Sequence, residues 1–298
     1  MVYYLEAEVV PQKCLGQYLA ITCIFGSLFA AAFNYFLLEP AMSHMRLVLG
    51  SFAAFYMLAY VLQLLFVKEE QMPPPKKEVD EDSSWFVRTI GYLFMFFRQC
   101  FTRKIFIYLA LCTGLNAASN VCRSMYIILF ATKELTIDLD TVGKITGISA
   151  IISAVLIYFF GKLMDRTHPM LIYFLGGLLV MITNVFSYFF LYDTNSFTVI
   201  SIVTTLVYAF QNLANMPLLV DILPRDKFGQ YASGNAMVNH VSLMIGSALG
   251  GVVTGWFGYR VMFVWDFVVT GLATLALIGV YFEWKRYGGR NYKAPIVD

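Results

Sequence analysis

The sequence predicts an all-α membrane protein, a bundle of eight transmembrane helices, and three observations support this fold class. First, 59% of the residues are hydrophobic and only 13% are charged, whereas a soluble domain carries about 25% charged residues. Second, the mean hydropathy is +0.68. Third, eight stretches hold the roughly 20 apolar residues that a membrane-crossing helix needs. The net charge of +2 gives no indication of nucleic-acid binding, so we expect the lipid bilayer, and no nucleic acid, as a partner.

Each of the eight stretches is bounded by charged or turn-forming residues. The predicted helices, in chain order, cover residues 15–37, 46–67, 106–132, 141–163, 169–192, 197–221, 231–256 and 260–284. Residues 1–8 look like the last two turns of a further helix. Pro217 should kink the helix over 197–221, because proline interrupts the hydrogen bonds of a helix.

Residues 68–104 form the only long connection in this scheme. Its first part, Lys68 to Ser84, is charged and contains three consecutive prolines, which favours an extended linker. Its second part, Trp85 to Arg103, mixes apolar and arginine side chains, and we expect a helix lying along the membrane surface. The alternative is that this part extends the helix that follows it.

The basic residues are distributed unequally between the two ends of the predicted helices. Of the 21 Lys and Arg, 16 fall in connections on one side and 4 on the other, with Arg123 inside a helix. The positive-inside rule places the basic side in the cytoplasm. We therefore expect a multi-pass protein of the inner (plasma) membrane, with the linker and the tail over 285–298 in the cytoplasm.

One pattern occurs twice: an acid, two aliphatic residues and a proline, then a basic turn and Gly-Gln-Tyr. Such a repeat indicates two related halves, and proline followed by glycine predicts a break between helices. The copies are Glu8-Val9-Val10-Pro11-Gln12-Lys13-Cys14-Leu15-Gly16-Gln17-Tyr18 and Asp221-Ile222-Leu223-Pro224-Arg225-Asp226-Lys227-Phe228-Gly229-Gln230-Tyr231.

Counting helices around each copy suggests an incomplete architecture. Residues 105–284 hold six helices, with the second copy between the fourth and the fifth, whereas the first copy is preceded only by a stub. We therefore expect residues 1–67 to be a partial N-terminal half, and an N-terminally truncated chain that does not transport alone. The alternative is a complete eight-helix protein whose repeat arose by chance.

These motifs resemble those of the major facilitator superfamily of transporters. The two copies lie where its loops between the fourth and fifth helices of each half would be. Gly161-Lys162-Leu163-Met164-Asp165-Arg166 resembles the family's G-x-x-x-D-R loop, although Thr167-His168-Pro169 replaces its usual continuation. The glycines at 246, 250, 251 and 255 resemble the glycine-rich helix that follows the loop motif, and we expect the stripe of Gly246 and Gly250 to form a packing seam.

The resemblance implies two six-helix halves joined by a cytoplasmic loop, and transport of a small solute by alternating access. Tyr3-Tyr4-Leu5 and Phe33-Asn34-Tyr35-Phe36 are similar to segments of members related to sugar–cation symporters. That similarity implies a sugar as solute and a proton or sodium ion as coupling ion.

Arg123 is the most informative single residue, because a charge inside a transmembrane helix normally faces a cavity or a partner. Asn116, Asn120 and Arg123 recur at helical spacing and form one polar face. This face could bind a carboxylate, a phosphate or sugar hydroxyls. The alternatives are an ion pair with Asp266 and an arginine that snorkels to the interface.

The helix over 197–221 supplies a second candidate face for the solute. Tyr208, Gln211 and Asn215 share this face, and a phenol with two amides suits a neutral polyhydroxyl ligand. Hydrogen bonding between helices would explain the same residues.

Coupling and gating residues are also predicted. Asp266 and His240 are coupling candidates, because buried carboxylates and imidazoles can carry protons. The alternatives are an ion pair or exposure to an outer vestibule for Asp266, and a buried, hydrogen-bonded imidazole for His240. The resemblance implies a cytoplasmic latch, and Asp165 would meet the helix that starts near Leu15 and Gly16, since a helix N-terminus favours an anion. The remaining latch candidates are Arg166, Asp221, Arg225 and Gly229, and ordinary solvated loop charges are the alternative.

The sequence contains no phosphate loop, nucleophile triad or metal-ligand cluster, so we expect neither an enzyme nor a cofactor. An integral-membrane enzyme would need clustered histidines or acids at one membrane face, and none occurs. The function favoured is transport of a small polar solute. A non-transporting membrane scaffold that needs a partner chain is the alternative.

Overall fold

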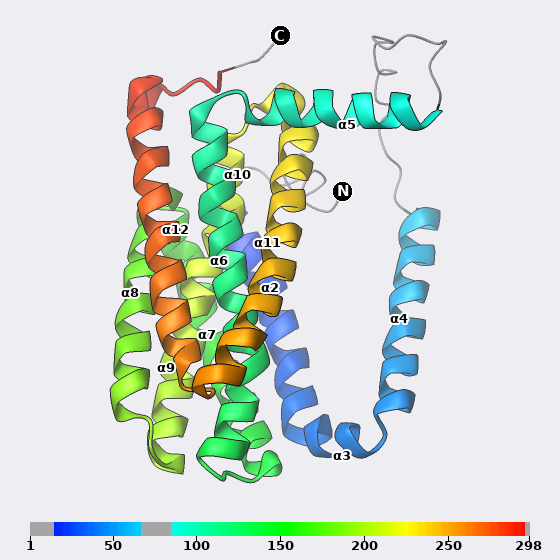
Figure 1. Cartoon of the computed structure of the whole chain (residues 1–298), viewed down its shortest axis with the longest axis vertical. Helices are drawn as coiled ribbons and strands as arrows, with labels where there is room; N and C mark the ends of the chain where they lie inside the picture. The colour runs from blue at the N-terminus through cyan, green and yellow to red at the C-terminus, as the bar shows by residue number, and fades with distance from the viewer. Residues whose placement is uncertain (1–14, 67–84, 296–298) are drawn as a thin grey trace.

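The computed structural model describes residues 15–66 and 85–295 (Figure 1). The expected stub over 1–8, the first copy of the repeated pattern up to Cys14 and the linker over 68–84 lie outside the described residues. Eight helices within the described residues are long and apolar enough to cross a membrane. The predicted all-α membrane bundle is therefore confirmed.

Most helices follow the predicted stretches within a few residues. The elements are α2 (Leu15–Ala32), the π-helix η2 (Phe33–Leu37), α3 (Leu38–Ser43), α4 (Met45–Phe66), α5 (Trp85–Phe101), α6 (Lys104–Leu129), the π-helix η3 (Phe130–Glu134), α7 (Leu139–Met164), α8 (Pro169–Phe190), α9 (Thr194–Leu213), α10 (Asn215–Ile222), the 3₁₀-helix η4 (Arg225–Lys227), α11 (Phe228–Phe257), α12 (Val261–Arg286) and the 3₁₀-helix η5 (Gly289–Asn291).

The helix expected over 197–221 is divided into α9 and α10 at Ala214. Pro217 is the physical cause, because it has no N–H to donate to the Leu213 carbonyl. The chain resumes helical hydrogen bonding with the Leu218 N–H donating to the Ala214 carbonyl at 3.1 Å. The interruption agrees with the expected kink.

The second copy of the repeated pattern forms the connection between α10 and α11. Leu223 and Pro224 have extended backbone, and η4 follows them. Helix α11 begins at Phe228, three residues earlier than expected, so Gly229 lies inside the helix and not in the turn. Gly16 occupies the same second position of α2. The two Gly-Gln-Tyr copies therefore open equivalent helices.

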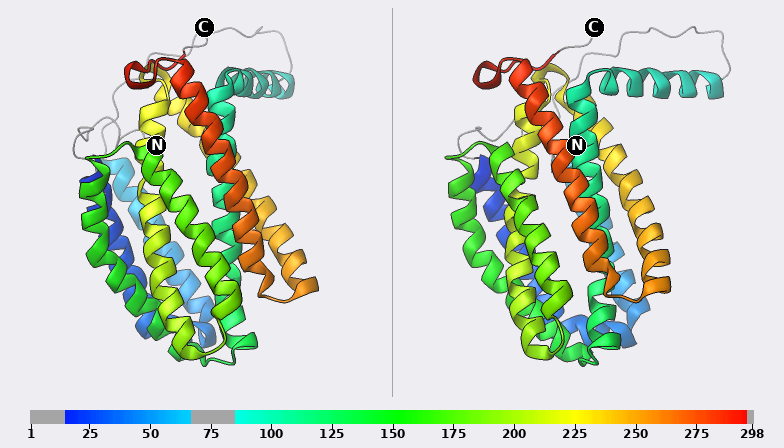
Figure 2. Two further views of the ribbon diagram at one scale, coloured as in Figure 1. Left: turned by 90° about the vertical axis from the view of Figure 1, so that its left-hand side faces the viewer. Right: turned by 60° about the vertical axis from the view of Figure 1, so that its left-hand side comes forward.

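Helix α5 is separate from α6 and runs crosswise to the long helices at the end that also holds the C-terminus (Figures 1 and 2). The backbone at Arg103 is extended, which ends any continuous helix. The alternative of one long helix is therefore wrong. Gln230 Nε2 donates to Gln99 Oε1 at 2.8 Å and ties α5 to α11; a position along the membrane surface stays a prediction.

The long helices pack in a definite order. Helix α6 packs against α11 and α12, α12 packs against α8, α8 packs against α9, and α9 packs against α7. Helix α2 completes this arrangement by packing along α7. Helix α4 stands apart from the others in Figure 1, and none of its membrane-spanning window is buried.

Glycines allow two of these helix pairs to approach closely. A Cβ atom on Gly246 of α11 would lie 2.7 Å from the Ala118 Cα of α6, and one on Gly250 would lie 2.7 Å from Cys122 Sγ. The predicted packing seam is thereby confirmed. On α7, a Cβ on Gly161 would lie 2.7 Å from Ala20 Cβ of α2.

The buried interior is divided into two apolar clusters with a polar layer between them. One cluster gathers around Leu109, Leu218 and Ile222, and the other around Phe130 and Phe263. Between them lie buried polar and charged side chains from α6, α8, α9 and α12. Polar and charged residues buried within transmembrane segments are commonly functional, so we expect the functional site in this layer.

Candidate functional site

An ion pair between Arg123 of α6 and Asp266 of α12 forms the centre of the polar layer. Arg123 Nη1 lies 3.3 Å from Asp266 Oδ2, and the side chains are 8% and 0% exposed. Charges this deep are costly unless they are paired and hydrogen-bonded. The pair with Asp266, one of the alternatives for Arg123, is therefore present in the structure.

Hydrogen bonds from two further helices complete the surroundings of the guanidinium. Arg123 Nη2 donates to Thr204 Oγ1 of α9 at 3.1 Å, and Nη1 donates to Asn184 Oδ1 of α8. The Phe263 ring lies 5.1 Å from the guanidinium carbon and the Tyr208 ring 5.5 Å from it. Aromatic faces attract such a cation, so the arginine is fixed on several sides.

The Asp266 carboxylate is equally well supplied with donors. Thr270 Oγ1 donates to Asp266 Oδ1 at 3.0 Å, and the hydroxyls of Ser119 and Tyr208 also donate to the carboxylate. Hydrogen bonds to a carboxylate stabilise its charged form. Arg123 and Asp266 thus form a charge-neutral pair whose hydrogen bonds connect α6, α8, α9 and α12.

A cavity of about 600 Å³ adjoins this unit on the side of α7 and α2. Such a volume lies within the usual range for small-molecule sites, about 300–1,000 Å³. Apart from Arg123, its polar walls are hydroxyls and amides; they come from Ser27, Asn120, Ser124, Thr146, Ser153, Ser201, Thr204, Thr205, Tyr208 and Asn212. The arrangement offers many neutral hydrogen-bonding groups and one neutralised charge.

The structure brings three of the predicted solute-binding residues to this cavity, namely Asn120, Arg123 and Tyr208. The other three lie outside its lining. Gln211 is 1% exposed and packs against α8, where a Cβ on Gly176 would lie 2.8 Å from its own Cβ. Asn116 and Asn215 each have a buried side-chain oxygen without a hydrogen-bond partner. A part in solute binding stays a prediction for all six.

Of the two coupling candidates, only Asp266 belongs to the polar layer. His240 is exposed on α11 and lies outside the lining of the cavity. The positions of Asp266 and His240 do not test ion coupling, which stays a prediction for both residues.

Asp165, at the end of α7, lies against the N-terminus of α2. Its Oδ1 accepts from the Gly16 N–H at 2.8 Å and its Oδ2 from the Gln17 N–H at 3.2 Å. A helix N-terminus has unpaired N–H donors and a positive dipole end, so the contact is favourable. The helix that the resemblance assigned to Asp165 is thus the one it contacts, while its role as a latch stays a prediction.

The other latch candidates lie near the same end of the bundle. Asp221 shares a small cavity of about 130 Å³ with Asp165 and lies 4.0 Å from His168 Nε2. Arg166 and Arg225 are exposed, and the Gly229 carbonyl accepts from Ser233 Oγ at 2.7 Å. No contact described for these residues shows a gate directly.

Sequence reasoning did not identify Asn184, nor Ser153, Thr205 and Ser201 on the cavity walls. A single amide within the apolar helix α8 was a usable signal for Asn184, because such groups need partners in a membrane. The hydroxyls gave no such signal. Serine and threonine can bond to their own helix backbone, as Thr205 Oγ1 does with the Ser201 carbonyl at 2.8 Å.

Comparison with known proteins adds one match. Residues 109–297 match the family model described as Major Facilitator Superfamily. The matched region includes most of α6 and all of α7 to α12, the helices that build the polar layer. No curated protein matches the chain.

Proposed function

The chain belongs to the major facilitator superfamily, a family of membrane transporters of small solutes, and from this membership we propose that it moves a neutral polar solute. The solute would bind in the cavity beside Arg123 and Asp266. The observation that supports this proposal is the cavity wall itself, where hydroxyls and amides surround a single charge that Asp266 already neutralises. Neutral hydroxylated molecules match such a wall, because each hydroxyl can both donate and accept.

An anionic solute would fit this wall less well. A carboxylate in the cavity would have to share Arg123 with Asp266, so that two buried anions would have one cation. If Arg123 instead left Asp266, breaking the buried pair would cost about 3–5 kcal/mol. We therefore propose a sugar-like or polyol-like solute in preference to an acid.

The contact between the C-terminal end of α7 and the N-terminal end of α2 suggests how access to the cavity could alternate. The Asp165 carboxylate joins the end of α7 to the first turn of α2, and the cavity has walls from both helices. Separating α2 from α7 would open the cavity at that end and would break these hydrogen bonds. Asp165 would thus act as a latch for one of two conformations.

We further propose the domain scheme and the orientation predicted from the sequence. Helices α6 to α12 would form one six-helix half, and α2 to α4 would belong to the other half. The excess of Lys and Arg at the end that carries the C-terminus would place this end in the cytoplasm. A coupling proton or sodium ion would have to act on Asp266, the acid of the polar layer.

Equilibrium binding to matched amide variants tests the solute site. The purified protein is titrated with radiolabelled hexoses, disaccharides and polyols, first to find a solute that binds. Replacing Asn120, which lines the cavity, by alanine should weaken binding of that solute about tenfold, because a lost hydrogen bond costs about 1–1.5 kcal/mol. Asn235→Ala, which removes a buried amide of α11 outside the lining, should leave the affinity unchanged. Equal losses in both variants, or a loss in Asn235→Ala alone, would contradict the proposed site.

A further inference from the structure

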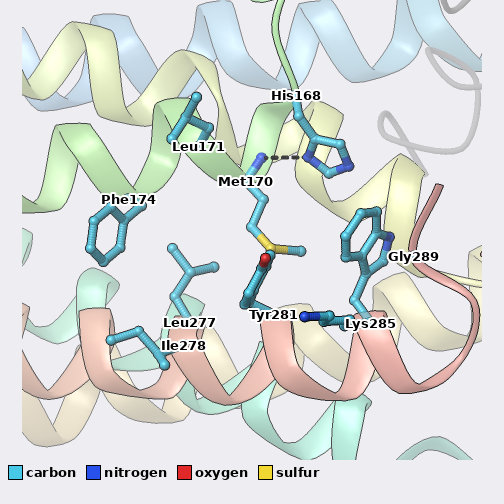
Figure 3. A pocket seen from close by; sticks show the side chains of 10 residues that line it. His168, Met170, Leu171, Phe174, Leu277, Ile278, Tyr281, Lys285 and Gly289 are labelled. Atoms are coloured by element: carbon cyan, nitrogen blue, oxygen red, sulfur yellow. Dashed lines mark hydrogen bonds between the residues drawn. The ribbon is translucent and has the colours of Figure 1, made fainter.

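A groove at the end of the bundle that holds the C-terminus is unrelated to the cavity above. It lies between the start of α8 and the end of α12 and has a volume of about 730 Å³ (Figure 3). Its walls are mostly apolar, with Leu171 and Phe174 from α8 facing Leu277 and Ile278 from α12. Leu171 is 51% exposed, so the groove opens on the outer surface of the bundle, where the bilayer would be.

Aromatic residues close one end of the groove. The Trp284 ring lies 6.0 Å from the Tyr281 ring and 5.1 Å from the His168 ring. His168 Nδ1 accepts from the Met170 N–H at 3.3 Å, which leaves Nε2 to carry a proton. Tryptophan and tyrosine concentrate where hydrocarbon meets water. This end of the groove therefore has the composition of the head-group level of a membrane.

The charges at this end are unbalanced in favour of a cation. Lys285 is exposed and is the only Lys, Arg, Asp or Glu among the described residues that line the groove, and its side chain is turned toward the groove in Figure 3. The nearby Glu283 pairs with Arg286 at 3.8 Å and not with Lys285. A ligand that extends from the apolar walls to this end would therefore meet a positive charge.

A second, polar cavity of about 740 Å³ continues from the groove, with His168, Trp284 and Gly289 lining both. Its charged residues, Asp221, Arg225, Asp226 and Lys293, are two acids and two bases. A neutral mixture of donors and acceptors suits hydroxyl groups better than a further charge.

We propose that this groove binds an anionic phospholipid with a hydroxylated head group, of the phosphatidylglycerol type. One acyl chain would lie between α8 and α12, the phosphate beside Lys285, and the head-group hydroxyls in the polar cavity. Along the groove, the apolar walls come first, then the aromatic residues, the single cation and the polar cavity. This is the order of acyl chain, interfacial region, phosphate and head-group hydroxyls along the lipid. Basic pockets between transmembrane helices are known to bind acidic head groups.

Lipid titration of the purified full chain in detergent, followed by native mass spectrometry, tests the proposal. The probes are phosphatidylglycerol and phosphatidylcholine with identical acyl chains. One lysine near a membrane surface supports about fivefold tighter binding of an acidic lipid. The wild type should therefore bind phosphatidylglycerol about fivefold more tightly than phosphatidylcholine, and Lys285→Gln should remove this preference.

Two further variants separate the groove from general electrostatics. Lys104→Gln removes an exposed lysine at the start of α6, outside both cavities, and should keep the preference. Ile278→Trp fills the groove and should weaken binding of both lipids, while circular dichroism checks that the helices are retained. The proposal would be overturned if the wild type bound both lipids with equal affinity, or if Lys104→Gln and Lys285→Gln lost the preference equally. It would also be overturned if the mass spectra showed a dimer of the chain that added lipid did not dissociate, because the groove would then be covered by a second copy.

Discussion

Breaking the Arg123–Asp266 pair should destabilise the bundle far more than removing the whole pair. Either Arg123→Met or Asp266→Leu leaves one buried charge without its partner, and an unpaired charge inside a membrane costs about 3 kcal/mol. The two single changes should therefore sum to about 6 kcal/mol of lost stability.

The double variant should lose much less, and the structure shows why. Three hydroxyls lose their acceptor when Asp266 is absent, but Ser119 Oγ and Thr270 Oγ1 lie 2.9 Å apart and can bond to each other. Removing Arg123 likewise takes the donors from Asn184 Oδ1 and Thr204 Oγ1. The Tyr208 hydroxyl can donate to the Asn184 side chain, which it already contacts, so the Thr204 hydroxyl is the group left without its partner, at a cost of about 1–3 kcal/mol. The difference from the additive sum is a coupling energy of about 3 kcal/mol or more.

A double-mutant cycle in mixed micelles measures this coupling, with unfolding by sodium dodecyl sulfate followed by far-ultraviolet circular dichroism. The control cycle uses Asp140 and Lys144, a partly exposed pair one turn apart on α7, for which about 0.3–0.5 kcal/mol is expected. A coupling below about 1 kcal/mol for Arg123 and Asp266 would refute the conclusion that the two charges depend on each other.

Three further predictions concern the seam, the latch and one helix cap. Gly246→Val should destabilise the bundle by about 1–3 kcal/mol because its side chain would overlap α6, whereas Gly255→Val, which meets open space, should not show this overlap cost; equal losses in thermal melts would contradict the seam. Asp165→Asn removes the negative charge from the α2 N-terminus and should increase the distance or mobility between spin labels on α2 and α7, an effect that Asp140→Asn should lack. Hydrogen bonds from the Ser196 side chain and N–H lower the pKa of Asp193 at the start of α9. The stabilisation that the Asp193 carboxylate provides is therefore present above the usual aspartate pKa and is lost as the pH falls through the lowered pKa. The difference in melting temperature between the wild type and Asp193→Ala should shrink in acid, and a difference that stays constant with pH would contradict this.

The helices and their breaks could be predicted from the sequence because they depend on local properties. Hydrophobic length identifies each membrane span, and Pro217 and Pro224 mark breaks that the structure contains. The glycine spacing on α11 likewise indicated a packing seam, and the structure shows that its partner is α6. Each of these features is decided by a residue and its immediate neighbours in the chain.

The composition of the cavity could be predicted only in part, because it depends on how neighbouring helices rotate. Gln211 and Asn212 are adjacent amides, and the sequence does not tell which one faces the cavity. The small surface of Gly176 on α8 lets Gln211 pack there, and Asn212 consequently lines the cavity. The partners of Arg123 raised the same difficulty, since nothing in the sequence indicates that α8, which carries Asn184, lies within reach of Arg123.

Competition between neutral solutes and their carboxylate counterparts tests the central claim most directly. Each sugar or polyol of the panel is paired with the acid obtained by oxidising one terminal carbon, and both compete for binding to the purified protein. If Asp266 neutralises Arg123, a neutral solute should bind at least about tenfold more tightly than its acid. This ratio corresponds to a difference of about 1.4 kcal/mol between the two binding free energies. An acid that binds as tightly as its neutral partner, or more tightly, would contradict a cavity made for neutral polar solutes.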